Sequence, residues 1–177
     1  MRQPSRVGLD TGWDRANGLI GLCMARKKVS RAEKKVLQSR LDLGLSCLTD
    51  KAVREATLAR CAKDIVYWIN NFVWQFNPKK VDEGRPVDPF VCWDFQAEAL
   101  TGDKGILWCM ANQEDLVIEK SREMGASWLI LLAAIHSWLF TPWAKLHMIS
   151  RSELLVESAD PDSLFWKVDF VLERLPD

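Results

Sequence analysis

The stretch DLVIEKSREMGASWLILLAAIHSWLF, residues 115–140, decides the fold class. It opens with a short apolar run at 115–120, which predicts a strand. A polar loop follows, and then a run that is apolar nearly all round, as expected of a helix buried against a sheet. AKLHMIS, residues 144–150, alternates and predicts a second strand. Strand, loop, helix and strand in this order predict an α/β fold with a parallel sheet.

The regions on either side predict helices. VSRAEKKVLQSRLDLGL, residues 29–45, is expected to be a helix that Ser30 caps and Gly44 ends. DPDSLFWKVDFVLERL, residues 160–175, is expected to be an amphipathic helix with Asp160 as its N-cap.

A polar segment that contains proline and glycine, KKVDEGRPVDP, separates two parts of the chain. We predict a helical, basic N-terminal segment at 1–78, a linker at 79–92, and the α/β part at 93–177.

Composition limits the class of protein. Of 177 residues, 48% are hydrophobic and 27% are charged, which is typical of a globular protein with a core. The five cysteines have no CxxC or zinc-ligand spacing and the first residues have no apolar signal core, so we expect reduced thiols in a cytosolic protein. The longest apolar run is too short to span a bilayer, so no membrane partner is expected.

The formal net charge of zero hides an uneven distribution. Residues 1–80 hold 16 Lys and Arg against 7 Asp and Glu, whereas residues 81–177 hold 8 against 17. The basic half could bind nucleic-acid phosphates. It could equally be a solvated helix face that packs near the acidic half.

The loop KSREMGAS, residues 120–127, has the context of a phosphate-binding loop. Such a loop turns from a strand into a helix, whose N-terminal N–H groups attract phosphate. In the GxxxxGK[ST] frame Gly125 and Ser127 match, but Lys120 occupies the first Gly position and Ala126 the Lys position. Lys120 could reach the same phosphates from the front of the loop. The alternative is an ordinary helix start that Ser127 caps.

Several motifs in fixed order resemble the large terminase subunit of tailed bacteriophages, the ATPase that drives viral DNA into an empty capsid. IEKSREMGASWL resembles its deviant Walker A segment, with the lysine at the front of the loop. DIVYWINNFVWQFNP resembles its aromatic segment, and PFVCWDFQAEAL the element whose glutamine recognises adenine. HMISRSELLVESADPDSLFWKVDFVLERLP resembles its second strand and the helix that follows. The resemblance covers about residues 61 to 176.

The resemblance implies the first part of a RecA-like P-loop NTPase domain, with an incomplete parallel sheet, that binds ATP and Mg²⁺. It implies that Lys120 contacts the β- and γ-phosphates, that Ser127 holds Mg²⁺ and that Gln96 recognises adenine. Arg122 would assist at the γ-phosphate, and Ser150 and Arg151 would line the site. The implied nucleotide-binding residues are Gln96, Lys120, Ser121, Arg122, Glu123, Met124, Gly125, Ala126, Ser127 and Arg151.

The resemblance also implies parts that this sequence does not match. A large terminase continues into a Walker B acid and a nuclease domain, so its full-length form is an ATPase and endonuclease. We therefore expect nucleotide binding but no catalytic residue in this chain.

The expected partners follow from the full-length protein, which acts in the host cytoplasm. They are double-stranded DNA, the small terminase subunit, the portal or procapsid, and further copies in a ring. The alternative is a non-enzymatic module that binds nucleic acid, the portal or the small subunit.

Overall fold

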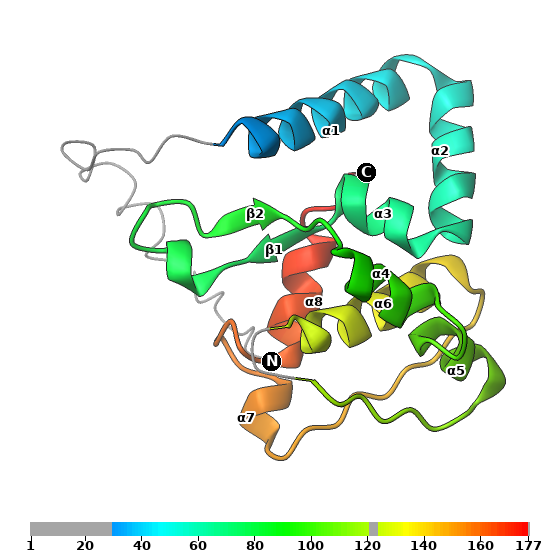
Figure 1. The fold of residues 1–177 in the computed structure, drawn as a ribbon, viewed down its shortest axis with the longest axis vertical. Coiled ribbons are helices and arrows are strands. Elements are labelled where there is room, and N and C mark those ends of the chain that lie inside the picture. The colour runs from blue at the N-terminus through cyan, green and yellow to red at the C-terminus, as the bar shows by residue number, and fades with distance from the viewer. Residues whose placement is uncertain (1–29, 121–123, 177) are drawn as a thin grey trace, which may run out of the picture.

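The computed structural model describes residues 30–120 and 124–176. Helices make up most of this part of the chain (Figure 1). In chain order the elements are α1 (Arg31–Thr49), α2 (Lys51–Lys63), α3 (Ile65–Phe72), β1 (Trp74–Phe76), η2 (Pro78–Lys80), β2 (Val87–Pro89), α4 (Asp94–Thr101), α5 (Ile106–Asn112), α6 (Ala126–Phe140), α7 (Glu153–Val156) and α8 (Leu164–Leu172).

The predicted N-terminal helix forms, but it runs further than expected. Ser30 caps α1 through its side chain, as predicted. The prediction that Gly44 ends the helix is wrong, because α1 continues to Thr49. A single glycine inside a helix costs only about 1 kcal/mol relative to alanine, and the rest of the helix offsets that cost. Asp50 separates the two helices, and its carboxylate caps α2.

A buried arginine ties α1 to the rest of the molecule. The guanidinium of Arg40 donates hydrogen bonds to the carbonyls of Asn70 at 3.0 Å, Val73 at 2.8 Å and Phe90 at 2.7 Å. Burial lowers the pKa of Arg40 to about 10. Several carbonyls therefore take the place of an acidic partner, and α1 is fixed over the end of α3.

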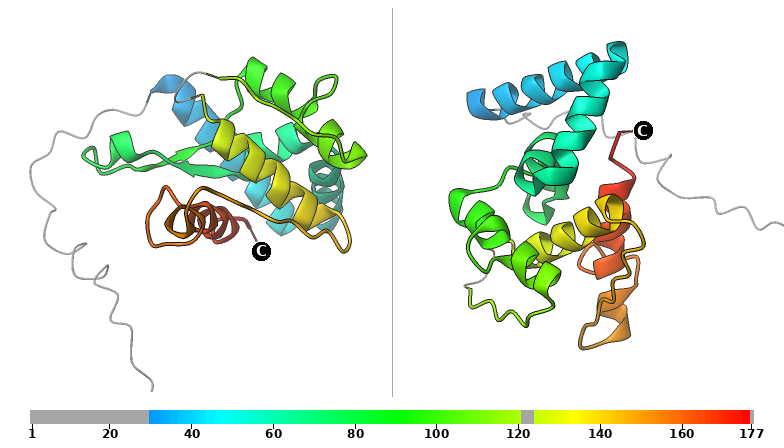
Figure 2. Two further views of the ribbon diagram at one scale, coloured as in Figure 1. Left: turned by 90° about the horizontal axis from the view of Figure 1, so that it is seen from below. Right: turned by 90° about the vertical axis from the view of Figure 1, so that its right-hand side faces the viewer.

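Helix α6 forms, as predicted, and its buried side chains lie in the core among those of other helices. Figure 2 shows α6 with α4 and α5 on one side and α8 on the other. Its side chains pack with residues of α2, α3, α4, α5 and α8 in one cluster, which contains Cys61, Ile65, Trp68, Ile69, Val73, Phe90, Leu100, Ile106, Leu129, Leu131, Leu132, Ala133, Ile135 and Val171. None of the helices that the structure describes is long and apolar enough to cross a membrane.

The predicted linker, 79–92, carries structure of its own. Strand β2 pairs antiparallel with β1, so that Trp74 lies opposite Pro89. Phe90 follows β2 and is buried in the core cluster. The core therefore draws side chains from all three predicted parts of the chain.

The two segments predicted as parallel strands, 115–120 and 144–150, have no regular secondary structure (Figure 1). Their apolar side chains are largely uncovered, with Val117 92% and Ile149 90% exposed. Within residues 30–120 and 124–176, the sheet that forms is the β1–β2 pair. The parallel sheet and the α/β class therefore stay predictions.

The C-terminal helix forms, but it starts later than predicted. Asp160 is not its N-cap, because the Asp160 carboxylate accepts the N–H of Asp162 at 2.8 Å in a turn before the helix. Ser163 caps α8 instead, by accepting the N–H of Trp166 at 3.3 Å. The helix thus starts about one turn later than expected and ends earlier, at Leu172.

Candidate functional site

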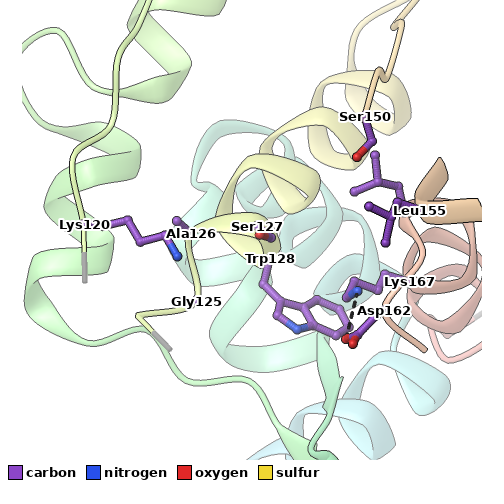
Figure 3. A pocket seen from close by; sticks show the side chains of 10 residues that line it. Lys120, Gly125, Ala126, Ser127, Trp128, Ser150, Leu155, Asp162 and Lys167 are labelled. Atoms are coloured by element: carbon purple, nitrogen blue, oxygen red, sulfur yellow. Dashed lines mark ion pairs between the residues drawn. The ribbon is translucent and has the colours of Figure 1, made fainter. Parts of the chain in front are cut away.

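A cavity of about 390 Å³ lies at the start of α6. Figure 3 shows Lys120 reaching toward this start from the segment before the loop, while Asp162 and Lys167 face it from the other side. The lining residues come from the loop, α6, α7, α8 and the segments between them. They are Lys120, Gly125, Ala126, Ser127, Trp128, Ser150, Leu155, Asp162, Leu164 and Lys167.

The turn into α6 depends on a glycine. Gly125 has φ 77° and ψ 11°, the left-handed conformation that a side chain disfavours. The first helical bond runs from the Leu129 N–H to the Gly125 carbonyl at 3.0 Å. Gly125, the N-cap residue, has no side chain that could cap this helix, and the N–H groups of Ala126, Ser127 and Trp128 have no intrahelical partner. The alternative, that Ser127 caps an ordinary helix start, is wrong, since the cap position belongs to Gly125.

Lys120 and Ser127 supply the polar side chains at the loop. The hydroxyl of Ser127 is on an exposed residue in the first turn of α6. Within the described residues, no ion pair involves Lys120. Both groups are thus available to a ligand that occupies the cavity.

A second lysine, Lys167, enters the cavity from α8. It is 8% exposed, and burial, opposed by the nearby Asp162 and Asp160, lowers its pKa. Its Nζ atom lies 3.9 Å from Oδ1 of Asp162, which is too long for a hydrogen bond. The Asp162 side chain is 88% exposed, so this carboxylate remains well hydrated. Lys167 is therefore a desolvated charge that its acidic neighbour only partly compensates.

Sequence reasoning missed Lys167 as a site residue. The lysine stands in DPDSLFWK, one of the motifs that carry the terminase resemblance, but its position on a later helix gave it no role. The contact between α8 and α6 brings it to the loop.

Gln96 lies against the loop but does not line the cavity. It is 5% exposed, and its Nε2 donates a hydrogen bond to the Met124 carbonyl at 3.1 Å. Its Oε1 accepts the N–H of Trp93 at 3.0 Å. The structure thus brings Gln96 to the predicted loop, with both ends of its amide already bonded.

The other predicted residues fall into two groups. Ser121, Arg122 and Glu123 lie outside the residues that the structure describes. Ser150 lines the cavity, whereas Arg151 is exposed and is not among the lining residues.

Magnesium fits this site only in company with phosphate. Among residues 30–120 and 124–176, no group of three or more His, Cys, Asp and Glu side chains could hold a metal ion. Mg²⁺ commonly binds through substrate phosphates, waters and one or two protein oxygens, and Ser127 offers one such oxygen. The ion would therefore arrive with a nucleotide.

No protein-family model, curated protein or solved structure matches this chain. The case for a function therefore depends on the cavity itself and on the motifs in the sequence.

A second cavity, of about 410 Å³, has a different chemistry. It lies between α1, α2 and α6 and is lined mainly by apolar side chains, with Arg54 on its wall. Leu48 and Leu58 at this cavity are 79% and 60% exposed. This surface could receive an apolar segment, and Arg54 is the charged residue among its described lining.

Proposed function

We propose that the chain binds ATP with Mg²⁺ through the cavity at the start of α6. The observation that carries the proposal is the convergence of two lysines on an uncapped helix start. Lys120 and Lys167 line the cavity, and Gly125 makes the turn that exposes the first N–H groups of the helix. Phosphate is the ligand that such an arrangement favours.

The charge balance of the cavity supports an anionic ligand. Among the residues that the structure describes, the charged ones on its wall are Lys120, Lys167 and Asp162, which gives this part of the wall an excess of one positive charge. Because Lys167 is desolvated, a phosphate would regain electrostatic stabilisation that the weak contact with Asp162 does not supply. The volume, about 390 Å³, is also within the usual range for a small-molecule site.

Each residue has a separate part in this binding. The ammonium of Lys120 contacts the terminal phosphates from the front of the loop. It thereby replaces the lysine of the usual phosphate-loop pattern, whose position Ala126 occupies in this chain. The N–H groups at the start of α6 bind phosphate oxygens, and the Ser127 hydroxyl occupies one position on Mg²⁺. Bound ATP supplies a cleavable phosphoanhydride, but we propose no residue of this chain as the catalytic acid or base.

The wider proposal follows from the resemblance. The chain would be the ATP-binding portion of a bacteriophage DNA-packaging protein in the host cytoplasm. Its full-length form would hydrolyse ATP to move double-stranded DNA, together with the small terminase subunit, the portal or procapsid and further copies of itself.

The direct test is a calorimetric titration of Mg·ATP into the wild-type chain and into Lys120→Ala. Losing one charge-assisted phosphate contact should weaken binding by about tenfold to a hundredfold. Lys34→Ala, which removes an exposed lysine from α1, is the matched control and should bind as wild type does. Equal affinity for all three proteins would exclude the role of Lys120, and no binding to wild type would exclude the function.

A second candidate is a binding module built on α1 and α2. Exposed basic residues on these helices stand beside the exposed leucines of the second cavity. If the basic residues bind DNA phosphates, the logarithm of affinity falls steeply with the logarithm of salt concentration, with a slope of several. A flat salt dependence would favour docking of a protein over nucleic acid.

A further inference from the structure

The amide of Gln96 joins two parts of the molecule that are far apart in sequence. Its oxygen accepts the Trp93 N–H at 3.0 Å, which satisfies a free donor at the start of α4. Its nitrogen donates to the Met124 carbonyl at 3.1 Å, at the residue before the turn into α6. One side chain therefore fixes the start of one helix and the loop before another.

The contact falls at the position that controls the turn. A Cβ atom added to Gly125 would lie 3.0 Å from Nε2 of Gln96, so the amide packs directly against the left-handed residue. The Met124 carbonyl that Gln96 binds belongs to the peptide unit that leads into Gly125. Holding this carbonyl fixes the orientation of the peptide from which α6 begins.

Recognition of adenine by Gln96 conflicts with this geometry. Pairing with adenine would use one donor and one acceptor of the amide. The Nε2 and Oε1 atoms each hold a protein partner, and the side chain is 5% exposed. To reach a base, the Gln96 side chain would have to move out of its buried position. The Trp93 N–H and the Met124 carbonyl would then lose their hydrogen bonds to Gln96.

We propose that Gln96 is a positioning residue for the phosphate site and does not read the base. It holds the Met124–Gly125 turn so that the N–H groups and hydroxyl of α6 face the cavity. A glutamine suits this position because it accepts from one backbone group while it donates to another, which a carboxylate or an ammonium cannot do. This inference rests on the proposed nucleotide site.

The role predicts that loss of the contact weakens every phosphate ligand alike. Gln96→Glu keeps the shape of the side chain and the acceptor for Trp93, but it removes the donor to the Met124 carbonyl. Gln96→Met removes both bonds without adding a charge. Gln113→Glu, at an exposed residue after α5, makes the same chemical change away from the loop and is the matched control.

The experiment measures dissociation constants for Mg·ATP, Mg·GTP and inorganic tripolyphosphate. Both Gln96 variants should raise the dissociation constants of all three ligands by a common factor of about ten. The dissociation constants of Gln113→Glu should stay within about twofold of those of wild type. A loss confined to ATP would assign base recognition to Gln96 and overturn the proposal. Unchanged affinities in both Gln96 variants would also overturn the positioning role of Gln96. The proposed function would still stand in that case, as long as the wild-type chain binds the nucleotide.

A second readout needs no ligand. Amide hydrogen exchange at residues 129–132, which carry the first hydrogen-bonded N–H groups of α6, should become faster in both Gln96 variants, whereas exchange in the first bonded turn of α8 should not change. Equal acceleration at both helix starts, or failure of both variants to fold, would show that Gln96 acts on the whole fold, and the proposal would fail. If exchange changes as expected but wild type binds none of the three ligands, the positioning of the loop stands and the proposed function falls.

Discussion

Two helices begin at the same cavity, and their starts are built in opposite ways. Helix α8 starts at Ser163, which is fully buried, and its hydroxyl accepts the Trp166 N–H and donates to the Ser158 carbonyl at 3.0 Å. Helix α6 starts after Gly125, and no side chain among residues 30–120 and 124–176 caps it. Within the described residues, a side chain therefore caps the start of α8, while none caps the start of α6.

The difference separates stability from binding. A buried serine that makes two hydrogen bonds stabilises the helix it caps. An uncapped start forgoes that stabilisation but leaves N–H groups and partial positive charge for an anion. We infer that α8 supports the site and that α6 forms it.

Replacing serine by alanine at the start of each helix should give the largest difference between α8 and α6. Ser163→Ala removes a helix cap and the donor to the carbonyl of the half-buried Ser158, so it should lower the free energy of unfolding by about 2 to 3 kcal/mol. Ser127→Ala should leave that free energy within about 0.5 kcal/mol of wild type, because Ser127 is exposed and alanine favours helix. Urea unfolding followed by circular dichroism measures both effects.

The binding data should show the reverse order. Ser127→Ala should lower the affinity for Mg·ATP by about tenfold and the affinity for metal-free ATP much less. Ser163→Ala should leave both affinities unchanged at a temperature where this variant is folded. Loss of stability in Ser127→Ala without loss of magnesium dependence would contradict the division between the two starts.

A pair of glycine variants should give the next largest effect. Gly125→Ala places a Cβ in the left-handed region and close to Gln96, so it should cost about 1 to 2 kcal/mol and weaken ATP binding. Gly44→Ala lies inside α1 with nothing within 4 Å of the added atom, and it should stabilise by about 0.5 to 1 kcal/mol. Equal effects at both positions, measured by thermal unfolding, would remove the special role of the turn.

Lys167→Met should give the smallest change in stability, with the opposite sign. Burial of the charge is the larger influence on Lys167, and its partner Asp162 stays hydrated without it. Methionine should therefore raise stability by about 0.5 kcal/mol at neutral pH, although it weakens ATP binding by about tenfold. A variant that loses stability and binds ATP normally would make Lys167 a structural residue.

The change in stability caused by Lys167→Met should depend on pH. A lysine whose pKa is lowered in the folded state carries its penalty at neutral pH, and the penalty fades as pH rises toward the ordinary value of 10.5. The stability difference between Lys167→Met and wild type should therefore be largest near neutrality and shrink in alkaline buffer. Unfolding curves collected at several pH values up to the ordinary pKa give this comparison.

The sequence predicted some parts of the site and fold because the relevant signals are local. The apolar run from Trp128 gave α6, and the glycine before it marked the turn. Ser30 marked the start of α1, where its hydroxyl accepts the Glu33 N–H at 3.1 Å. In each case the residues that decide the structure lie within one turn of each other.

Other features depend on contacts between distant segments. Lys167 reaches the cavity because α8 packs on α6, and Gln96 meets a carbonyl 28 residues later in the chain. Arg40 binds carbonyls at the end of α3 and in the segment after β2. No local sequence pattern predicts these contacts. Asp160 was predicted as a cap because its spacing suits one, but the turn before α8 uses its carboxylate.

The most direct measurement is a crystal structure of the chain with a non-hydrolysable ATP analogue and Mn²⁺ in place of Mg²⁺. If the proposed site is correct, an anomalous Mn²⁺ peak will lie within coordination distance of the Ser127 hydroxyl. The terminal phosphates will then lie between Lys120 and Lys167 at the start of α6. An analogue bound at any other surface, or phosphates that contact neither lysine, would contradict the proposed site.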